Sequence, residues 1–235
     1  FRTRAGVPGD MDLDVRIARA KGAAVWRYLP LGINRDARAW VRAAVRAGNV
    51  HAARIVVKGD LGRFPFADRQ GGQFLATVPL SAATLQFAPD WPEIRELSGE
   101  LIFEGSAMRA RVRQGRILGV GIGPTQAEIA DLEHDPVLTV RGRATGPTAE
   151  FLRFVEASPV GTYIDHFTED MRATGQAGLD LALTIPLDRA ADTSAKGSLS
   201  IADNRLVIDP ALPPLTEASA LIEFSNEALN VRNAQ

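Results

Sequence analysis

The 235-residue sequence contains no cysteine. It therefore has no disulfide framework, no thiolate metal site and no cysteine nucleophile. It also has no run of about 18 apolar residues, the length that a membrane-spanning helix needs, and its first residues lack the basic segment and apolar core of a secretory signal peptide. The chain begins at Phe1 and ends inside a strand pattern near Val231, so we expect a segment of a longer protein.

Neither sign of charge is in excess. The sequence has 27 Lys and Arg residues against 28 Asp and Glu residues, for a formal net charge of −1. This balance produces no long-range field that would attract nucleic acid or an anionic membrane surface. We therefore expect no nucleic-acid partner, while a hydrophobic content of 46% predicts a folded chain.

Groups that could carry out chemistry are few and scattered. His51, His134 and His166 are far apart, and none stands in a metal-ligand spacing. Residues 165–170 contain acidic side chains beside His166, but such residues are common on exposed helical turns. The glycines of residues 119–123 lack the Lys-Ser/Thr pair of a phosphate-binding loop. Aromatic content of only 6% argues against a carbohydrate-acting enzyme. The sequence thus predicts no enzyme, no catalytic residue, no metal site and no cofactor.

The stretch from Gly72 to Arg113 alternates between apolar and polar side chains. A period of two places the apolar set on one face of a sheet, and we interpret the stretch as four successive half-buried strands. The apolar set is Phe74, Ala76, Val78, Ala83, Leu85, Phe87, Leu101, Phe103, Met108, Ala110 and Val112. Arg109, Arg111 and Arg113 alternate with the last three of these and should point to solvent.

Further strands are expected over residues 117–122, 127–132, 137–144 and 179–185, and then onward to Val231. Gly123-Pro124 and residues 134–136 would separate the first three of them. Short turns between strands favour a sequential antiparallel meander. The predicted class is therefore mainly β, an elongated and curved antiparallel sheet.

A pattern from the first half of the chain returns in the second half. The segment from Trp91 to Phe103 is echoed by the segment from Leu212 to Phe224, and 213 − 92, 217 − 96 and 224 − 103 all equal 121. Met108 maps by the same shift onto Leu229. A constant offset indicates a repeated module.

Two helical regions interrupt the strands. The first is expected near 34–47, with Asn34 as its N-cap and Gly48 placed to end it. Arginines spread around that helix predict a solvated surface rather than a phosphate site. The second is expected over 148–172, split at Ser158-Pro159. We therefore divide the chain into a first module at 1–146 and a second, C-terminally truncated module at 147–235, sharing one continuous sheet.

The apolar faces of these strands must be covered, and the pattern alone leaves two solutions open. In one, the sheet folds over a second sheet as a sandwich with a closed apolar core, which suits a structural or protein-interaction module. In the other, the sheet curls into an open trough whose interior is filled by something other than protein.

Several short motifs occur in an order that resembles the YhdP branch of the AsmA-like family. They are Tyr28-Leu29-Pro30-Leu31-Gly32, the helix with Trp40, Gly59-Asp60-Leu61, Phe64-Pro65-Phe66, Trp91-Pro92, Ser158-Pro159 and Ile185-Pro186-Leu187. The resemblance runs from about Tyr28 to the end of the chain. Members of this family are large envelope proteins of Gram-negative bacteria, anchored in the inner membrane and extended across the periplasm.

The resemblance implies the trough, in the form of repeated groove modules. It implies a periplasmic lipid-transfer bridge that carries phospholipid acyl chains between the inner and outer membranes, and it supplies no catalytic residue and no cofactor. Contacts with the two membranes would be made by parts of the full-length protein that are absent here. The residues expected to line the groove are Phe74, Ala76, Val78, Leu85, Phe87, Leu101, Phe103, Met108, Ala110, Val112, Ile222 and Phe224.

Overall fold

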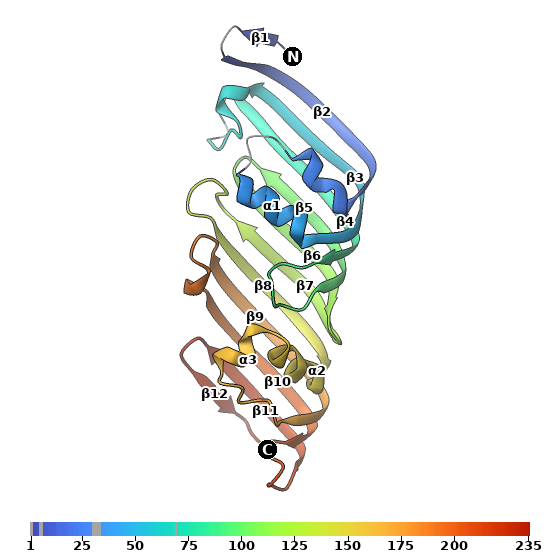
Figure 1. Cartoon of the computed structure of the whole chain (residues 1–235), viewed down its shortest axis with the longest axis vertical. Coiled ribbons are helices and arrows are strands. Elements are labelled where there is room, and N and C mark those ends of the chain that lie inside the picture. Colours follow the sequence, from blue (N-terminus) through green and yellow to red (C-terminus); the bar gives the residue numbers. More distant parts are fainter. Residues whose placement is uncertain (1, 5–6, 30–33, 69) are drawn as a thin grey trace.

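The computed structural model describes residues 2–4, 7–29, 34–68 and 70–235. Pro30, Leu31 and Gly32 of the motif quoted above lie outside these residues. Within the described part, the chain forms one twelve-stranded sheet in which each strand pairs antiparallel with its neighbour in sequence (Figure 1). The strands are β1 (Arg2–Arg4), β2 (Val7–Lys21), β3 (Val45–Asp60), β4 (Gly72–Leu85), β5 (Ile94–Glu104), β6 (Ala107–Ile117), β7 (Val120–Ile129), β8 (Val137–Pro147), β9 (Arg172–Pro186), β10 (Ser194–Val207), β11 (Leu215–Ser225) and β12 (Leu229–Arg232).

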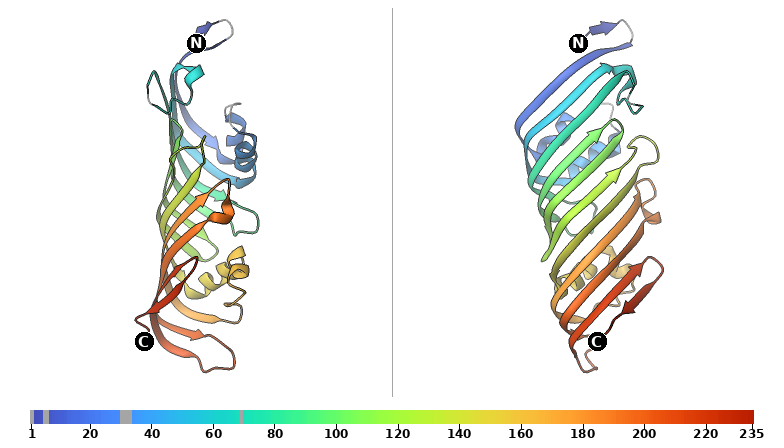
Figure 2. Two further views of the ribbon diagram at one scale, coloured as in Figure 1. Left: turned by 90° about the vertical axis from the view of Figure 1, so that its left-hand side faces the viewer. Right: turned by 180° about the vertical axis from the view of Figure 1, so that it is seen from behind.

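The helices lie on one face of this sheet, on its concave side (Figure 2). The first group consists of a 3-10 helix, η1 (Gly22–Tyr28), and α1 (Arg35–Ala44), and it lies between β2 and β3. The second group, α2 (Thr148–Glu156) and α3 (Pro159–Tyr163), lies between β8 and β9. Two further 3-10 turns, η2 (Leu61–Arg63) and η3 (Ala190–Asp192), follow β3 and β9. The mainly β class, the elongated curved sheet and the two short helical inserts are thus confirmed. The expected end of the second insert at 172 is wrong, because α3 ends at Tyr163 and β9 begins at Arg172.

Asn34 caps α1 as predicted, and the break predicted at Ser158-Pro159 is the start of a second helix with its own cap. The side chain of Asn34 accepts a hydrogen bond of 2.8 Å from the backbone N–H of Asp36, and the hydroxyl of Ser158 accepts one from Val160 with Pro159 in the first turn of α3. The predicted end of the first helix is wrong. α1 stops at Ala44, and Gly48 lies inside β3 with a φ of 137°.

Bulges give the sheet its curvature. Ala52, Ala82, Glu96, Asp203 and Glu217 have φ between 48° and 57°, and each lies at an interruption of the strand register. A bulge inserts one residue, bends its strand and increases the local twist. Because β3, β4 and β5 are adjacent, and so are β10 and β11, the bends of neighbouring strands add up across the sheet.

The bulges also correct two strand assignments. We expected Phe74 to Val78 and Ala83 to Phe87 to be separate strands, but β4 runs through both with the bulge at Ala82. Likewise β7 runs through Gly123-Pro124, where the pairing with β8 shifts. In both places the residues of a turn occur inside a strand, because a bulge accommodates a conformation that a regular strand does not.

The repeat is present in the backbone itself. The bulge residues Ala82 and Asp203, with φ of 48° and 52°, are 121 positions apart, and so are Glu96 and Glu217, with φ of 54° and 57°. The cross-strand pairs repeat in the same way: Ala76, Phe103 and Met108 lie opposite one another, and so do their counterparts Gly197, Phe224 and Leu229. One repeat therefore spans six strands. The predicted module boundary at 146/147 falls at the end of β8, which pairs with β9 across it.

The sheet has little enclosed core. Among the described residues, only twelve hydrophobic side chains are buried. The accessible surface of 15,064 Å² far exceeds the roughly 10,300 Å² expected for a compact protein of this mass. All twelve strands of the described residues belong to one sheet in linear order, so no second sheet packs against it there. The sandwich alternative is therefore wrong.

Candidate functional site

Apolar side chains form continuous rows across one face of the sheet, which we call the apolar face. Each row connects residues that lie directly opposite one another on successive strands. The first row is Val15, Ile55, Ala76, Phe103, Met108, Ile129, Leu138 and Ile185. The second row is Val78, Leu101, Ala110, Ala127, Val140, Leu183 and Ala195. Eight strands thus contribute to the first row without a polar interruption.

Two more rows extend the apolar face toward the C-terminus. The third is Leu80, Gly99, Val112, Thr125, Gly142, Leu181, Gly197, Phe224 and Leu229, and the fourth is Gly115, Ile122, Ala144, Leu179, Leu199, Ile222 and Val231. Glycines in the third row leave room for large neighbours. A Cβ on Gly197 would meet the Phe224 ring at 2.6 Å, so this ring lies over the glycine backbone.

The opposite face carries charged and polar side chains that pair between strands. Arg54 contacts Asp14 at 2.7 Å, Arg143 contacts Asp180 at 2.6 Å, and Arg109 lies between Glu104 and Glu128 at 3.4 and 3.3 Å. The hydrogen bond from Arg54 is the main cause that lowers the pKa of Asp14. The side chains of these ions are between 38% and 77% exposed, so each pair contributes little to stability. The expectation that Arg109, Arg111 and Arg113 lie on the solvent side agrees with this arrangement, although Arg109 is also ion-paired.

The helices lie over the apolar face and are joined to it by aromatic residues. The ring of Phe154 in α2 is 6.0 Å from that of Trp91 in the β4–β5 loop, and Trp91 is 5.5 Å from Phe87. From the other helix, α1, the indole N–H of Trp40 donates to the backbone oxygen of Phe87 at 2.9 Å. The β4–β5 loop therefore contacts both helical inserts.

One end of the apolar face is closed by α2. Val120, Ala177 and Ile201, near the start of this helix, are each at most 6% exposed. The carboxylate of Glu150 in α2 accepts a hydrogen bond of 2.8 Å from the backbone N–H of Gly119, in the β6–β7 turn. Away from the helices, residues such as Phe103 and Met108 are only partly buried. The apolar face is thus covered at the helices and open between them.

The structure brings the residues expected to line a groove onto this one face. Phe74, Ala76, Val78 and Leu85 lie in β4, Leu101 and Phe103 in β5, Met108, Ala110 and Val112 in β6, and Ile222 and Phe224 in β11. Phe87 lies just beyond β4, in the aromatic cluster described above. The ring of Phe74 packs 5.0 Å from that of Phe64, in the loop after β3.

Sequence reasoning missed several members of the same face. Ile129, Leu138, Val140 and Ile185 join the rows from β7, β8 and β9. Their alternation with polar neighbours was a signal that could have found them. The contact of Phe154 with Trp91 had no such signal, because it depends on how a loop and a distant helix meet.

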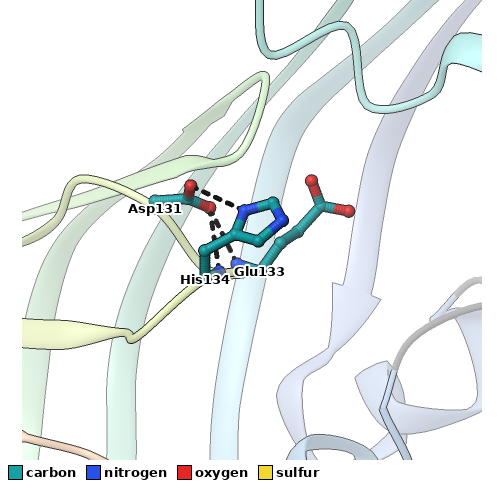
Figure 3. Close-up of side chains that lie close together, drawn as sticks. All are labelled: Asp131, Glu133 and His134. Atoms are coloured by element: carbon teal, nitrogen blue, oxygen red, sulfur yellow. Dashed lines mark hydrogen bonds and ion pairs between the residues drawn. The ribbon is translucent and has the colours of Figure 1, made fainter.

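One group of side chains has the composition of a metal site. Asp131, Glu133 and His134 lie in the β7–β8 turn (Figure 3). The Asp131 carboxylate is already engaged: it accepts 2.8 Å and 3.4 Å hydrogen bonds from the backbone N–H groups of Glu133 and His134, and it contacts His134 Nδ1 at 3.0 Å. The bond from Glu133 is the main cause that lowers the pKa of Asp131. The group therefore stabilises the turn.

A family model for the YhdP protein matches residues 1–235. The chain belongs to the YhdP family. It is 27% identical over 219 residues to the Escherichia coli (strain K12) protein named intermembrane phospholipid transporter YhdP. The match covers 91% of this chain and 17% of that YhdP protein, so the chain spans about a sixth of its length. No solved structure matches this YhdP-family chain.

Among the residues that the structure describes, no helix is long and apolar enough to cross a membrane.

Proposed function

We propose that the apolar face is a groove that carries the acyl chains of phospholipids, as part of a bridge between the inner and outer membranes. The observation that carries the proposal is the first row, in which eight strands present apolar side chains and six of these eight side chains stay partly exposed. The related Escherichia coli protein is named an intermembrane phospholipid transporter, which supports the same cargo.

The energetics suit an acyl chain as the cargo. Burial of a methylene group contributes about 0.8 kcal/mol, so a chain lying across the rows gains stabilisation from many small contacts without any directed bond. Such contacts are replaced one by one as the acyl chain slides, and the headgroup lies outside the apolar rows. The site needs no catalytic residue and no cofactor, and we propose a transport role rather than an enzymatic one.

The proposed location is the periplasm, as part of a longer protein. Its membrane contacts would then lie in segments outside this chain. A role as a protein-interaction module is the competing proposal, and its closed-core form is excluded by the open sheet.

Co-purified lipid tests the proposal. The protein is purified without detergent, its lipids are extracted, and phospholipid per protein is counted by mass spectrometry. Phe103→Asp places a carboxylate in the first row and should lower occupancy strongly, because a charge among acyl chains is costly to desolvate. Ile102→Asp is the matched control, since Ile102 lies on the opposite face between Thr77 and Arg109. Wild-type protein without phospholipid, or equal occupancy in both variants, would contradict the groove.

A further inference from the structure

The positive charge of α1 is concentrated along one side of the helix. Arg35, Arg38 and Arg42 are spaced by three and four residues, and Arg46 continues the series just beyond the helix end. Residues at this spacing lie on the same side of a helix. The opposite side carries Trp40 and the fully buried Ala44. We call the four arginines the arginine stripe.

The stripe borders a pocket rather than a plain solvated surface. A shallow cavity of about 460 Å³ is lined by Trp26, Arg35, Arg38, Ala39, Arg42, Ala43 and Arg46. Arg38 is held by hydrogen bonds to the backbone oxygens of Trp26 and Leu29, at 3.3 and 2.6 Å. The guanidinium of Arg42 lies 4.8 Å from the centre of the Trp26 ring, a cation–π contact that fixes its position. The sequence alone predicted a solvated surface, because it could not place Trp26 beside the helix.

Three of the four arginines of the stripe have no carboxylate partner among the described residues. Within the described residues, no carboxylate forms an ion pair with Arg35, Arg42 or Arg46. Like charges at this spacing destabilise a helix by about 0.2–0.5 kcal/mol per pair, and Arg35 also lies at the positive end of the helix dipole. A bound anion would remove both penalties.

The corresponding pocket beside α2 differs in charge. It has a volume of about 220 Å³ and contains Arg153 and Arg172, but Glu156 and Glu169 line it as well. Arg153 contacts Glu150 at 3.5 Å, and Arg172 donates to the backbone oxygen of Glu169. Excess positive charge is thus a property of the α1 pocket and not of every helix on the apolar face.

We propose that the arginine stripe binds the phosphate group of a phospholipid whose acyl chains lie on the apolar face. Guanidinium groups match phosphate oxygens with paired hydrogen bonds. α1 lies on the helix-covered, concave side of the sheet, which is the side of the apolar face (Figure 2). A phosphate held by the stripe would therefore lie on the same side of the sheet as acyl chains on the apolar face. This inference rests on the proposed function for the position of the acyl chains.

Binding of three small probes tests the site. Isothermal titration is carried out with monomeric dihexanoylphosphatidylglycerol, with dihexanoylglycerol, which has the same acyl chains and no phosphate, and with inorganic phosphate. The protein should bind the phospholipid at least tenfold more tightly than it binds dihexanoylglycerol, because two charge-assisted hydrogen bonds to the phosphate contribute at least this factor. The preference should fall as ionic strength rises.

Two triple variants locate the effect. Arg35→Gln/Arg42→Gln/Arg46→Gln should bind both lipid probes with equal affinity and lose phosphate binding. Arg111→Gln/Arg113→Gln/Arg141→Gln removes the same charge from exposed positions of the polar face and should keep the tenfold preference. Thermal melting checks that each variant is folded. If the stripe variant does not fold, Arg42→Lys takes its place and should weaken the preference, because lysine lacks the paired donors.

The outcomes separate this inference from the proposed function. A phospholipid preference that survives in the stripe variant would overturn the arginine site and leave the groove standing. If the wild-type protein binds neither lipid probe but still binds phosphate, both the groove and the assignment of the stripe to a lipid headgroup are overturned, and the stripe is a site for free phosphate. If the protein binds phosphatidylglycerol vesicles but not the monomeric lipid, the headgroup site is also overturned, in favour of contact with a membrane surface.

Discussion

Trp91, in the β4–β5 loop, packs against Phe154 of α2 with ring centroids 6.0 Å apart. The contact joins the β4–β5 loop to the helix that follows β8, across the open side of the sheet. Such tilted aromatic pairs contribute about 0.5–1.5 kcal/mol beyond the area they bury. A double-mutant cycle of Trp91→Ala and Phe154→Ala, measured by chemical denaturation, should therefore give a coupling energy of this size. Additive losses would mean that the loop and the helix are not in contact in solution.

A buried amide connects α2 to the sheet. Asn204 is fully buried; its carbonyl oxygen accepts a 2.5 Å hydrogen bond from the Thr148 hydroxyl, and its amide donates to the backbone oxygens of Gln176 and Ala202. Asn204→Ala leaves these groups without a partner and should destabilise by about 2 kcal/mol or more. The exposed Asn230→Ala should change stability by less than about 0.5 kcal/mol. Equal effects of the two substitutions on thermal unfolding would contradict the buried network.

Stability should depend on pH through Glu156. Its carboxylate accepts a hydrogen bond of 2.6 Å from the Thr168 hydroxyl and lies 3.3 Å from His166 Nδ1; these contacts, chiefly the first, hold the pKa of Glu156 below its usual value. A lowered folded-state pKa contributes stability that is complete above the unfolded-state pKa and is lost as the pH falls through the folded-state value.

Thr168→Val should therefore lower the melting temperature at neutral pH, and its effect should shrink as the pH falls through the lowered folded-state pKa of Glu156, below which the carboxyl is protonated in both states. Thr184→Val, an exposed hydroxyl on the polar face, is the control and should show no such pH dependence. A Thr168→Val effect that is constant across the pH range would show that the hydroxyl does not stabilise the charged carboxylate.

Substitution by glycine should change folding stability in opposite directions at a bulge and at a regular strand position. Ala82 and Asp203 have φ of 48° and 52°, a conformation that costs a residue with a side chain about 1–2 kcal/mol. Ala82→Gly should therefore stabilise the protein or leave it unchanged. Ala144→Gly, in the unbulged strand β8, should lose about 0.5–1 kcal/mol. Denaturant midpoints of the two variants check the difference, and a loss at Ala82 as large as at Ala144 would contradict the bulge.

The alternation of Met108, Ala110 and Val112 with arginines predicted the strands and their faces because the side-chain period of a strand is local. The repeat was also visible, since Phe103 and Phe224 keep a constant offset. The bulge at Ala82 could not be predicted from the sequence, because alanine carries no signal for a positive φ. The helix end at Ala44 and the pocket around Trp26 could not be predicted either, because both depend on contacts between distant segments.

The rows of directly opposed residues do not connect equivalent residues of the 121-residue repeat. This determines the path of anything that moves along the molecule. The first row ends at β9, whereas the third continues to β12. Phe103 lies in the first row and its counterpart Phe224 in the third. Neighbouring rows are two residues apart along a strand, so equivalent residues of the repeat shift by four residues, or about 13 Å, over six strands. A cargo travelling down the long axis must cross diagonally from row to row. The continuity of the apolar face in two dimensions, rather than the length of a single row, therefore determines whether the path is unbroken.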